Sequence, residues 1–369
     1  MRVSNRFLYY QLVKDIGEST EKLFNLNGQI SSGKRINKPS EDPIGLSRVL
    51  IYRSELNSFD QFEKSIDQAK GWLSRMDAIL MDADNLLARA SELAIQQASA
   101  TATSQTRSGA AEEIEEIRNM MIGLANSKYA NKYMFGGTMT QNSPFLSADV
   151  EDWQADVNTM AADHAGAVAN LGGAASAGDR YINTTDGTIY EYDGAVWQVS
   201  SAASEGISAV VDDQNELYVY SGGQWTSQYQ GNSSTYSVKI GKNDIVELNI
   251  PGDEIFNNGA GDVLMTLMRL EQALRGNDQE GISDELPEIE NASKKLLDKL
   301  AGIGAKVNRF DQSKSILERA EVDTKESTSL IEDLDYAEAI TSLQNQETIY
   351  EATLKSASMI TGLSLVDYV

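Results

Sequence analysis

The chain has 369 residues, of which 41% are apolar and 23% are charged, and its formal net charge is −24. This length allows two or three domains, and the composition is that of a folded protein. The acidic balance excludes a nucleic-acid binder, which needs a basic surface for phosphate contacts. It also excludes a surface that docks on anionic lipid. The absence of cysteine excludes disulfides, thiolate metal sites and a cysteine nucleophile.

The charge is unevenly spread along the chain. Residues 145–260 hold 17 acidic and three basic residues, a net charge of −14, whereas the first 56 residues hold nine basic and six acidic ones. We expect the middle to face solvent and the ends to pack closely. No stretch approaches 18 apolar residues, so we expect no membrane insertion. The first residues lack the apolar region of a signal peptide, so if the protein leaves the cell we expect a route that cleaves no leader.

A first helix is predicted over 4–32. Its apolar face is marked by Val13, Ile16, Leu23 and Ile30. Gly33 suits the left-handed position that ends a helix. Asp42 and Pro43 then restart a helix as N-cap and first helical residue. We expect the linker between them to set the geometry of the chain through its glycine and two prolines: Gly33, Lys34, Pro39, Asp42 and Pro43.

A second helix is predicted over 43–98 and carries the longest heptad pattern. Its apolar residues alternate at steps of three and four: Phe59, Phe62, Ile66, Ala69, Leu73, Met76, Leu80, Ala83, Leu87, Ala90 and Ala94. A repeat of 3.5 residues favours a left-handed supercoil against other helices. A third helix should end near 125, and the Gly136-Gly137 pair predicts a hairpin between 133–135 and 138–140.

The middle of the chain, 145–255, is predicted to be β-rich. The run from Ile189 through Tyr190 and Tyr192 to Trp197 returns 28 residues later as Leu217, Tyr218, Tyr220 and Trp225, with a turn glycine in each copy. This repeat predicts two similar hairpins stacked in one antiparallel module. Strands at 236–240 and 245–250 are expected to join it. The aromatic residues are interpreted as its core, and the alternative is a glycan-binding face.

Helices are predicted again over 263–274 and 284–331. The second continues the seam of the rod with Leu296, Leu300, Ile303, Val307 and Phe310. After a break at 332–334, a last helix should use an apolar stripe for assembly: Ile340, Leu343, Tyr350, Leu354, Ala357, Leu363 and Leu365. The interrupted terminal stripes predict helices that order when other copies supply the missing faces.

The predicted fold is therefore α+β, a long antiparallel coiled-coil rod built from both termini with an inserted β-rich domain. Five segments are expected: an N-terminal helix with its linker, the first part of the rod, the inserted domain, the second part of the rod and a C-terminal helix, over 1–42, 43–144, 145–255, 256–332 and 333–369.

Catalytic and cofactor signatures are weak. His164 is the only histidine, and no nucleotide-binding or nucleophile motif is present. We interpret His164 as solvent-exposed and without function. A calcium site among Asp179, Asp186, Asp193 and Asp212 is an alternative without the usual loop spacing. We therefore predict no enzyme activity and no cofactor.

Four segments carry a family resemblance. They are 29–43, which ends in Lys-Pro-Ser-Glu-Asp-Pro, 124–138, 302–309 and 332–339, and the C-terminal 363–369 is also similar. Together they resemble the bacterial flagellin superfamily. The two prolines near the end of the first segment are similar to the branch that joins hook to filament, rather than to flagellins. The resemblance covers about 1–145 and 260–369 and leaves the middle unassigned.

The resemblance implies an extracellular axial protein at the hook–filament junction of the flagellum, exported by the flagellar type III apparatus. Its implied partners are copies of itself in a ring, a hook-side hook-associated protein, flagellin, and an export chaperone on the C-terminal helix. A flagellin filament subunit is one alternative. A secreted glycan-binding adhesin that uses the aromatic repeat is another.

Overall fold

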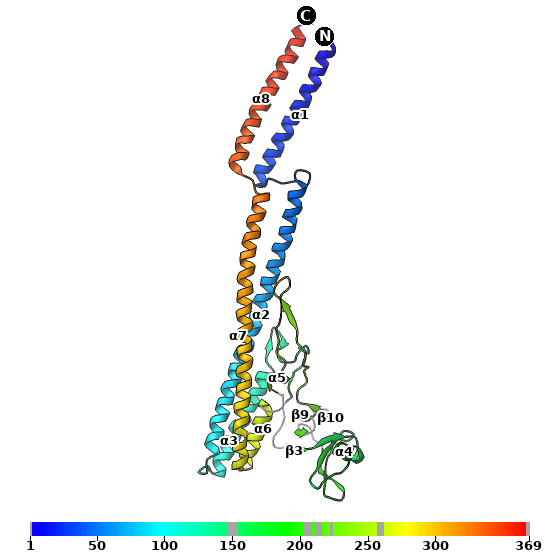
Figure 1. Ribbon diagram of the computed structural model, residues 1–369, viewed down its shortest axis with the longest axis vertical. Helices are drawn as coiled ribbons and strands as arrows, with labels where there is room; N and C mark the ends of the chain where they lie inside the picture. Colours follow the sequence, from blue (N-terminus) through cyan, green and yellow to red (C-terminus); the bar gives the residue numbers. More distant parts are fainter. Residues whose placement is uncertain are drawn as a thin grey trace. The chain divides into compact units, whose positions relative to one another are not determined.

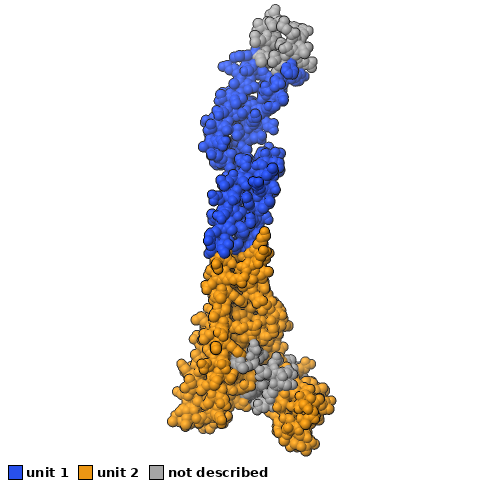
Figure 2. Space-filling model, in the orientation of Figure 1, with its two compact units in different colours: residues 1–63, 314–369 blue, residues 64–313 orange. Residues whose placement is uncertain are grey.

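The computed structural model of the protein describes residues 2–146, 154–202, 208–211, 216–221, 224–256 and 262–366. These residues are mostly helical, with short strands in small sheets (Figure 1). The chain forms two compact units, unit 1 with residues 1–63 and 314–369, and unit 2 with residues 64–313 (Figure 2). Both boundaries between the units fall inside long helices, whereas the five predicted segments are divided mostly at breaks between helices.

The described residues form eight helices: α1 Arg2–Ser32, α2 Pro43–Gln97, α3 Ser104–Ala125, α4 His164–Asn170, α5 Asp253–Phe256, α6 Val263–Arg275, α7 Gln279–Glu332 and α8 Tyr336–Val366. The ends of α1, α2, α3 and α6 match the predicted helices closely. Helix α7 begins before its predicted start at 284. Its first turn is held by Asp278, whose carboxylate accepts the Glu280 N–H at 3.1 Å and whose carbonyl accepts the Ile282 N–H.

Within unit 1, α1 and α8 run side by side (Figure 1). Gln346 of α8 donates to the Ser19 hydroxyl of α1 at 2.7 Å. The parts of α2 and α7 in this unit also pair, through Arg53 and Glu332. Few of the described apolar side chains here are buried, Val49 and Leu317 among them. The core of unit 1 is therefore thin.

Within unit 2, α2 and α7 run antiparallel. Lys70 pairs with Asp311, Ser293 donates to Asp84 at 2.6 Å, and Gln279 donates to the Ala98 carbonyl at 2.9 Å. Residue numbers thus fall along α7 as they rise along α2. Helices α3 and α6 pack on each other, and the buried Arg118 of α3 pairs there with the buried Glu271 of α6.

The predicted seam residues lie at different depths. Eight of them are buried in unit 2: Ile66, Leu73, Met76, Leu80, Leu87, Leu296, Ile303 and Phe310. Four are half-buried: Phe59, Phe62, Leu300 and Val307. Trp72, Ile79 and Leu93 of α2 are buried as well, although they lie outside the heptad register. Helix α2 therefore buries more than one face in unit 2, where further elements pack on it.

The described strands are β1 Lys128–Tyr129, β2 Lys132–Tyr133, β3 Gln154–Val157, β4 Thr159–Ala161, β5 Arg180–Asn183, β6 Ile189–Tyr192, β7 Trp197–Ser201, β8 Ser208–Val211, β9 Glu216–Ser221, β10 Gln224–Ser227, β11 Ser237–Lys239 and β12 Ile245–Glu247. They form two four-stranded sheets, in the orders β4-β5-β6-β7 and β10-β9-β8-β3, and two two-stranded ribbons, β1-β2 and β11-β12.

The prediction of one purely antiparallel module is wrong. The hairpins β6-β7 and β9-β10 form as the repeat predicts, but each lies in its own sheet. Each sheet is completed by a parallel strand, β4 beside β5 and β3 beside β8. The two sheets share a core of Val157, Ile182, Ile189 and Ala209. The repeat predicted the two hairpins, but it does not contain the strands of the parallel pairs, which are β3, β4, β5 and β8. Gly222, the turn glycine of the second copy, lies outside the described residues.

Two further strand predictions need correction. The ribbon β11-β12 does not join the repeat sheets. It lies against α2 instead, where the ring of Tyr236 packs edge-on to Trp72. The strand pair predicted around Gly136-Gly137 forms earlier, between β1 and β2, because Ala130 and Asn131 take the positive φ angles of a tight turn. The glycine pair forms a turn of its own, in which the Met139 N–H reaches the Gly136 carbonyl.

Within unit 2, the chain enters and leaves the inserted sheets along two adjacent segments. Phe145 bridges Tyr229, and the Leu146 N–H donates to the Gln228 carbonyl. The aromatic rings of Phe145, Phe256 and Phe135 then pack in sequence, with centroids 5.6 and 5.3 Å apart. Residues 229–256 thus belong with the helices rather than with the repeat sheets, so the β-rich insertion is shorter than the predicted 145–255.

Candidate assembly site

The linker after α1 and the break before α8 lie side by side in unit 1. Lys34 forms an antiparallel β-bridge with Asp333. The Arg35 N–H donates to the Glu332 carbonyl at 2.7 Å, and the Leu334 N–H donates to the Gly33 carbonyl at 3.0 Å. We call residues 33–43 and 331–336 the crossover. Backbone pairing within it fixes the two points where the chain passes from one helix pair to the other.

Glu332 is the charged centre of the crossover. Its carboxylate accepts Lys34 Nζ at 2.6 Å and Arg53 Nη2 at 2.5 Å, and the residue is only 7% exposed. Burial alone would raise the pKa of Glu332. The hydrogen bonds and charges of Lys34 and Arg53 outweigh this and hold the pKa below its usual value. The carboxylate therefore stays ionised near neutral pH and links the linker to both α2 and α7.

Arg35 and Asp42 complete the polar contacts. The guanidinium of Arg35 donates twice to the Ile331 carbonyl near the end of α7, at 2.7 and 3.1 Å, and lies 3.5 Å from the Asp42 carboxylate. Asp42 accepts the Gly45 N–H at 2.8 Å, which is its predicted role as N-cap of α2. A basic side chain at a helix C-terminus and an acidic one at an N-terminus both match the helix dipoles.

Gly33 permits the sharp turn out of α1. Its φ of +70° is in the left-handed region, as predicted for a residue that ends a helix. A Cβ built at this position would lie 2.8 Å from the Tyr336 hydroxyl. The position therefore excludes side chains for two reasons, the backbone angle and the close approach of α8.

The α1–α8 pair leaves large apolar side chains exposed. On α1 these include Phe7, Tyr10 and Phe24, exposed to 70%, 61% and 74%. On α8 they include Ile349 and Met359, exposed to 53% and 58%. Large apolar side chains with this exposure are candidates for an interaction site. These five residues lie outside the apolar register of the two predicted stripes, so the heptad pattern did not indicate them.

The predicted assembly residues divide between two environments. Val13, Ile340 and Leu354 are exposed, to 50%, 46% and 42%. Six are half-buried: Ile16, Leu23, Ile30, Leu343, Tyr350 and Ala357. Leu23, Leu343 and Tyr350 line a groove of about 420 Å³ between α1 and α8 of the same chain. The side chains of Leu363 and Leu365 lie outside the described ones. Part of the predicted stripe is thus used within the chain, and part is available to a partner.

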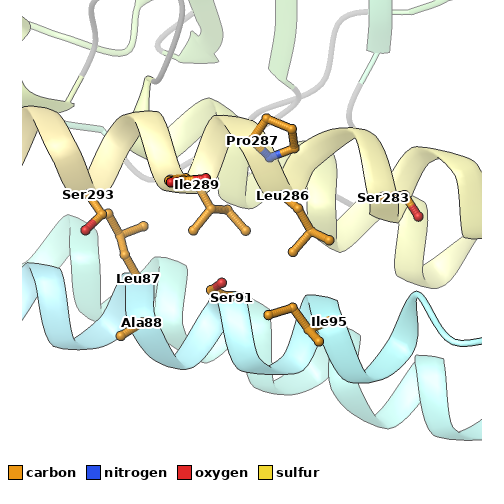
Figure 3. A pocket seen from close by; sticks show the side chains of 10 residues that line it. Leu87, Ala88, Ser91, Ile95, Ser283, Leu286, Pro287, Ile289 and Ser293 are labelled. Carbon is orange, nitrogen blue, oxygen red and sulfur yellow. The ribbon is translucent and has the colours of Figure 1, made fainter.

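A second groove lies between α2 and α7 in unit 2. It has a volume of about 560 Å³. Figure 3 shows Leu87, Ser91 and Ile95 of α2 on one side and Leu286 and Ile289 of α7 on the other. Among the described residues that line it, Glu290 is the only titratable one. The groove can accept apolar side chains, and these lining residues include no nucleophile paired with a base.

The remaining chemical candidates have structural roles. His164 is exposed as expected, but its Nδ1 lies 2.6 Å from the Tyr181 hydroxyl and its ring stacks on Trp197. Asp179, Asp186 and Asp193 accept backbone N–H groups in turns, and Asp212 lies outside the description. Among the described residues no cluster of acidic and histidine side chains could hold a metal ion. No helix in the described part of the chain has the length and hydropathy to cross a membrane.

The aromatic repeat contributes to packing. Tyr190 and Trp197 pack against the buried cluster of Ala161, Ala167 and Tyr181, and Tyr218 packs against the shared core of the two sheets. The side chain of Trp225 is outside the described ones. These contacts favour the core interpretation of the aromatic residues over a glycan-binding face.

Comparisons with known proteins agree with the helical part of this fold. The family models for the bacterial flagellin N-terminal and C-terminal helical regions match residues 3–140 and 286–369. Flagellar hook-associated protein 3 of Salmonella typhimurium is 28% identical over 149 residues, 40% of this chain and 47% of the relative. The Escherichia coli protein of the same name is 27% identical over 146 residues, 39% and 46% of the two chains. The chain spans about half the length of these curated relatives.

A solved structure from Vibrio parahaemolyticus, assigned as a flagellar hook-associated protein, aligns with a TM-score of 0.54 and 16% identity. The alignment covers 79% of this chain and 99% of the other. At this identity the likeness shows a shared fold. The matched relatives are structural flagellar proteins and not enzymes. With both terminal helical regions matched, the chain belongs to the bacterial flagellin family and resembles its hook-associated protein 3 type.

Proposed function

We propose that the protein is a structural junction protein of the bacterial flagellum, which assembles as a ring of copies between hook and filament. The observation that carries the proposal is the crossover together with the exposed apolar side of the α1–α8 pair. Two helix pairs in one chain meet at a polar connection, and the terminal pair presents Phe7, Tyr10 and Phe24 to a partner. The two named relatives are flagellar hook-associated proteins 3.

In this proposal the terminal helix pair forms coiled-coil contacts between copies, and the paired parts of α2 and α7 form a rod from which the β-rich insertion projects. The crossover accommodates the difference between a bendable hook and a stiff filament. Its backbone pairs are few and its side-chain contacts are charged. A small change in the angle between helices therefore stretches hydrogen bonds without opening an apolar core.

The same arrangement suits export. An export chaperone on α8 would cover the apolar residues that are exposed before assembly. After assembly, the hook-side neighbour and flagellin would cover them. Because the apolar contacts of the terminal pair are incomplete within one chain, most of its stabilisation must come from partners. The protein would then be extracellular, at the hook–filament junction.

Immunogold electron microscopy of intact flagella with an antibody against residues 145–255 tests the proposal. We expect one band of label between hook and filament. Label along the whole filament would instead assign the chain to the filament subunits. Label confined to the cell body or to shed material would favour the adhesin and reject the junction role.

A further inference from the structure

The groove between α2 and α7 in unit 2 lies along an apolar stripe of α2 that remains exposed. This stripe repeats every seven residues, at Met81, Ala88 and Ile95, and all three are exposed. A step of seven residues keeps side chains on nearly the same face of a helix. Ala88 and Ile95 line the groove, and Met81 lies one heptad before Ala88. Helix α2 therefore carries a second stripe besides the seam that it buries.

A matching stripe runs along α7. Its positions alternate at steps of four and three, at Leu286, Glu290, Ser293 and Leu297. The first three line the groove, and Leu297 is 51% exposed. Ser293 donates to Asp84 of α2, which ties the two helices together beside the stripes. Two adjacent helices with stripes at this spacing form the kind of surface on which a third helix packs in a coiled coil.

The groove has room for large side chains of another molecule. Its lining includes the small residues Ala88, Ser91 and Ser293 beside the larger Leu286 and Ile95 (Figure 3). In a coiled coil, a large side chain of one helix fills a hole formed by residues of the facing helices. The size pattern of the lining therefore fits a helix with large apolar residues on one face.

The walls of the groove are acidic. Residues 81–97 of α2 and 279–297 of α7 hold eight acidic and three basic residues, a net charge of −5. Among the basic residues, Arg89 is already paired with Glu92 and Glu113. Glu290 is an exposed member of the α7 stripe and pairs with no basic side chain of the described residues. A helix that covers Glu290 must bring a positive charge to it, because a carboxylate buried without a partner is costly.

We infer that this groove is the docking site for a basic amphipathic helix of a partner protein. Apolar side chains of that helix pack on the two stripes, and a lysine or arginine pairs with Glu290. Amphipathic helices are commonly recognised in grooves of this kind. The site lies in unit 2, apart from the terminal helix pair on which the proposed function rests.

The charge of the chain argues against a second copy as the occupant. Helices α1 and α8 leave large apolar side chains exposed, so they are the helices that another copy could offer. Helix α1 holds four basic and three acidic residues, and α8 holds one basic and three acidic residues. Together they carry a net charge of −1, which gives no attraction to an acidic groove. A basic helix from a different protein complements the groove better.

The test uses the purified full chain and a fluorescently labelled synthetic helix as the probe. The probe is about three heptads long, with leucine on its apolar face and lysine on both sides of that face. A second probe carries glutamate in place of each lysine. Fluorescence anisotropy should show that the lysine probe binds at least about tenfold more tightly than the glutamate probe. Amide hydrogen exchange at 81–97 and 283–297 should slow when the lysine probe is bound.

Two variants separate the groove from other exposed apolar surfaces. Glu290→Lys should weaken binding of the lysine probe about tenfold and strengthen binding of the glutamate probe, because the charge that faces the partner is reversed. Ile95→Ser should weaken binding of the lysine probe about fivefold, because it removes apolar contact area. The matched controls are Glu318→Lys, exposed on α7 outside the groove lining, and Met120→Ser, exposed on α3. Neither control should change the affinity, and thermal unfolding shows that each variant is folded.

Three results would overturn the inference. Equal binding of the two probes would show that charge does not select the partner. A folded Glu290→Lys chain that binds the lysine probe as the native chain does, or amide protection confined to α1 and α8, would place the probe outside the groove. Self-association of the chain alone that Glu290→Lys abolishes would assign the groove to a second copy. All of these measurements use purified protein, so their outcome is independent of the position of the chain on the flagellum.

Discussion

Lys34 and Glu332 come from opposite ends of the chain, and their Nζ and Oε1 atoms lie 2.6 Å apart. The same Glu332 oxygen accepts Arg53, so one carboxylate joins the linker, the start of α2 and the end of α7. The side chains of Lys34 and Arg53 are 42% and 46% exposed, whereas the side chain of Glu332 is 10% exposed. A partly buried acceptor with two charged donors contributes more to the free energy of unfolding than an exposed surface ion pair does.

Glu332→Gln should weaken the crossover while preserving its shape. The amide keeps the volume and one acceptor oxygen but loses the charge that both cations contact. We expect a loss of about 1–2 kcal/mol in the stability of unit 1, since hydrogen bonds to charged groups contribute about 1.5–3 kcal/mol. Amide exchange at 33–36 and 331–336 should report it. Glu318→Gln, an exposed glutamate of the same helix, is the control and should change nothing. Equal exchange in both variants would show that Glu332 is not the centre of the crossover.

Gly17 inside α1 and Gly33 directly after it make a matched pair for a second prediction. Gly33→Ala should destabilise unit 1, because its φ is +70° and the new Cβ would meet the Tyr336 hydroxyl at 2.8 Å. Gly17→Ala should stabilise α1 by up to about 1 kcal/mol, since the new Cβ would meet nothing within 4 Å beyond the adjacent backbone of its own helix, and alanine has the higher helix propensity. Thermal unfolding followed by circular dichroism measures both. A stabilising Gly33→Ala would contradict the assigned helix end.

Local signals in the sequence predicted the helices well. Gly33, Asp42 and Pro43 each specify a backbone conformation by themselves, so the ends of α1 and α2 were predictable. The heptad positions from Ile66 to Leu87 also predicted a buried face. The contacts of Glu332 could not be predicted, because they join residues from the two ends of the chain. The division of the strands into two sheets could not be predicted for the same reason, because β3 and β4 pair in parallel with strands that lie farther along the sequence.

Leu354→Asp should block incorporation into flagella. Leu354 is 42% exposed on α8, so its role in the proposed assembly is contact with another copy. A charge there would be buried between copies without a partner, at a cost of several kcal/mol. The core over 43–330 should keep its thermal unfolding transition. Ser356→Asp, also exposed on α8, is the control and should incorporate more readily. If Leu354→Asp removed the core transition, the C-terminal helix would belong to the fold of the monomer.

Replacing both Pro39 and Pro43 by alanine should impair the accommodation between hook and filament. Each proline restricts the linker, and its loss adds about 0.4–1 kcal/mol of conformational entropy to the unfolded chain. We expect slower swimming and a wider spread of hook–filament angles in electron micrographs. Pro287→Ala in α7 controls for proline removal outside the linker. Unchanged motility and bending in the double variant would refute a role for linker stiffness.

The pH dependence of the two units should differ in sign. In unit 1 the pKa of Glu332 is depressed in the folded state, so its contribution is present above the unfolded value of about 4.3 and is lost as the pH falls through the folded value. In unit 2 burial raises the pKa of Asp262 to about 7. The hydrogen bonds from the Met265 and Leu264 N–H groups and the charges of Lys295 and Arg269 lower this pKa, but they offset only part of the effect of burial. Burial also raises the pKa of Glu285 to about 7.

A raised folded pKa gives stability that is complete below the unfolded value, about 3.9 for aspartate, and that is lost as the pH rises through about 7. Unit 2 should therefore unfold at a lower temperature at pH 8 than at pH 5. Asp262→Asn should reduce this dependence, because the amide oxygen can still accept the two N–H groups at the start of α6 but no longer titrates. Combining it with Glu285→Gln should reduce the dependence further. If unit 2 of the native chain unfolded at the same temperature at both pH values, burial would not raise the pKa of either carboxyl group.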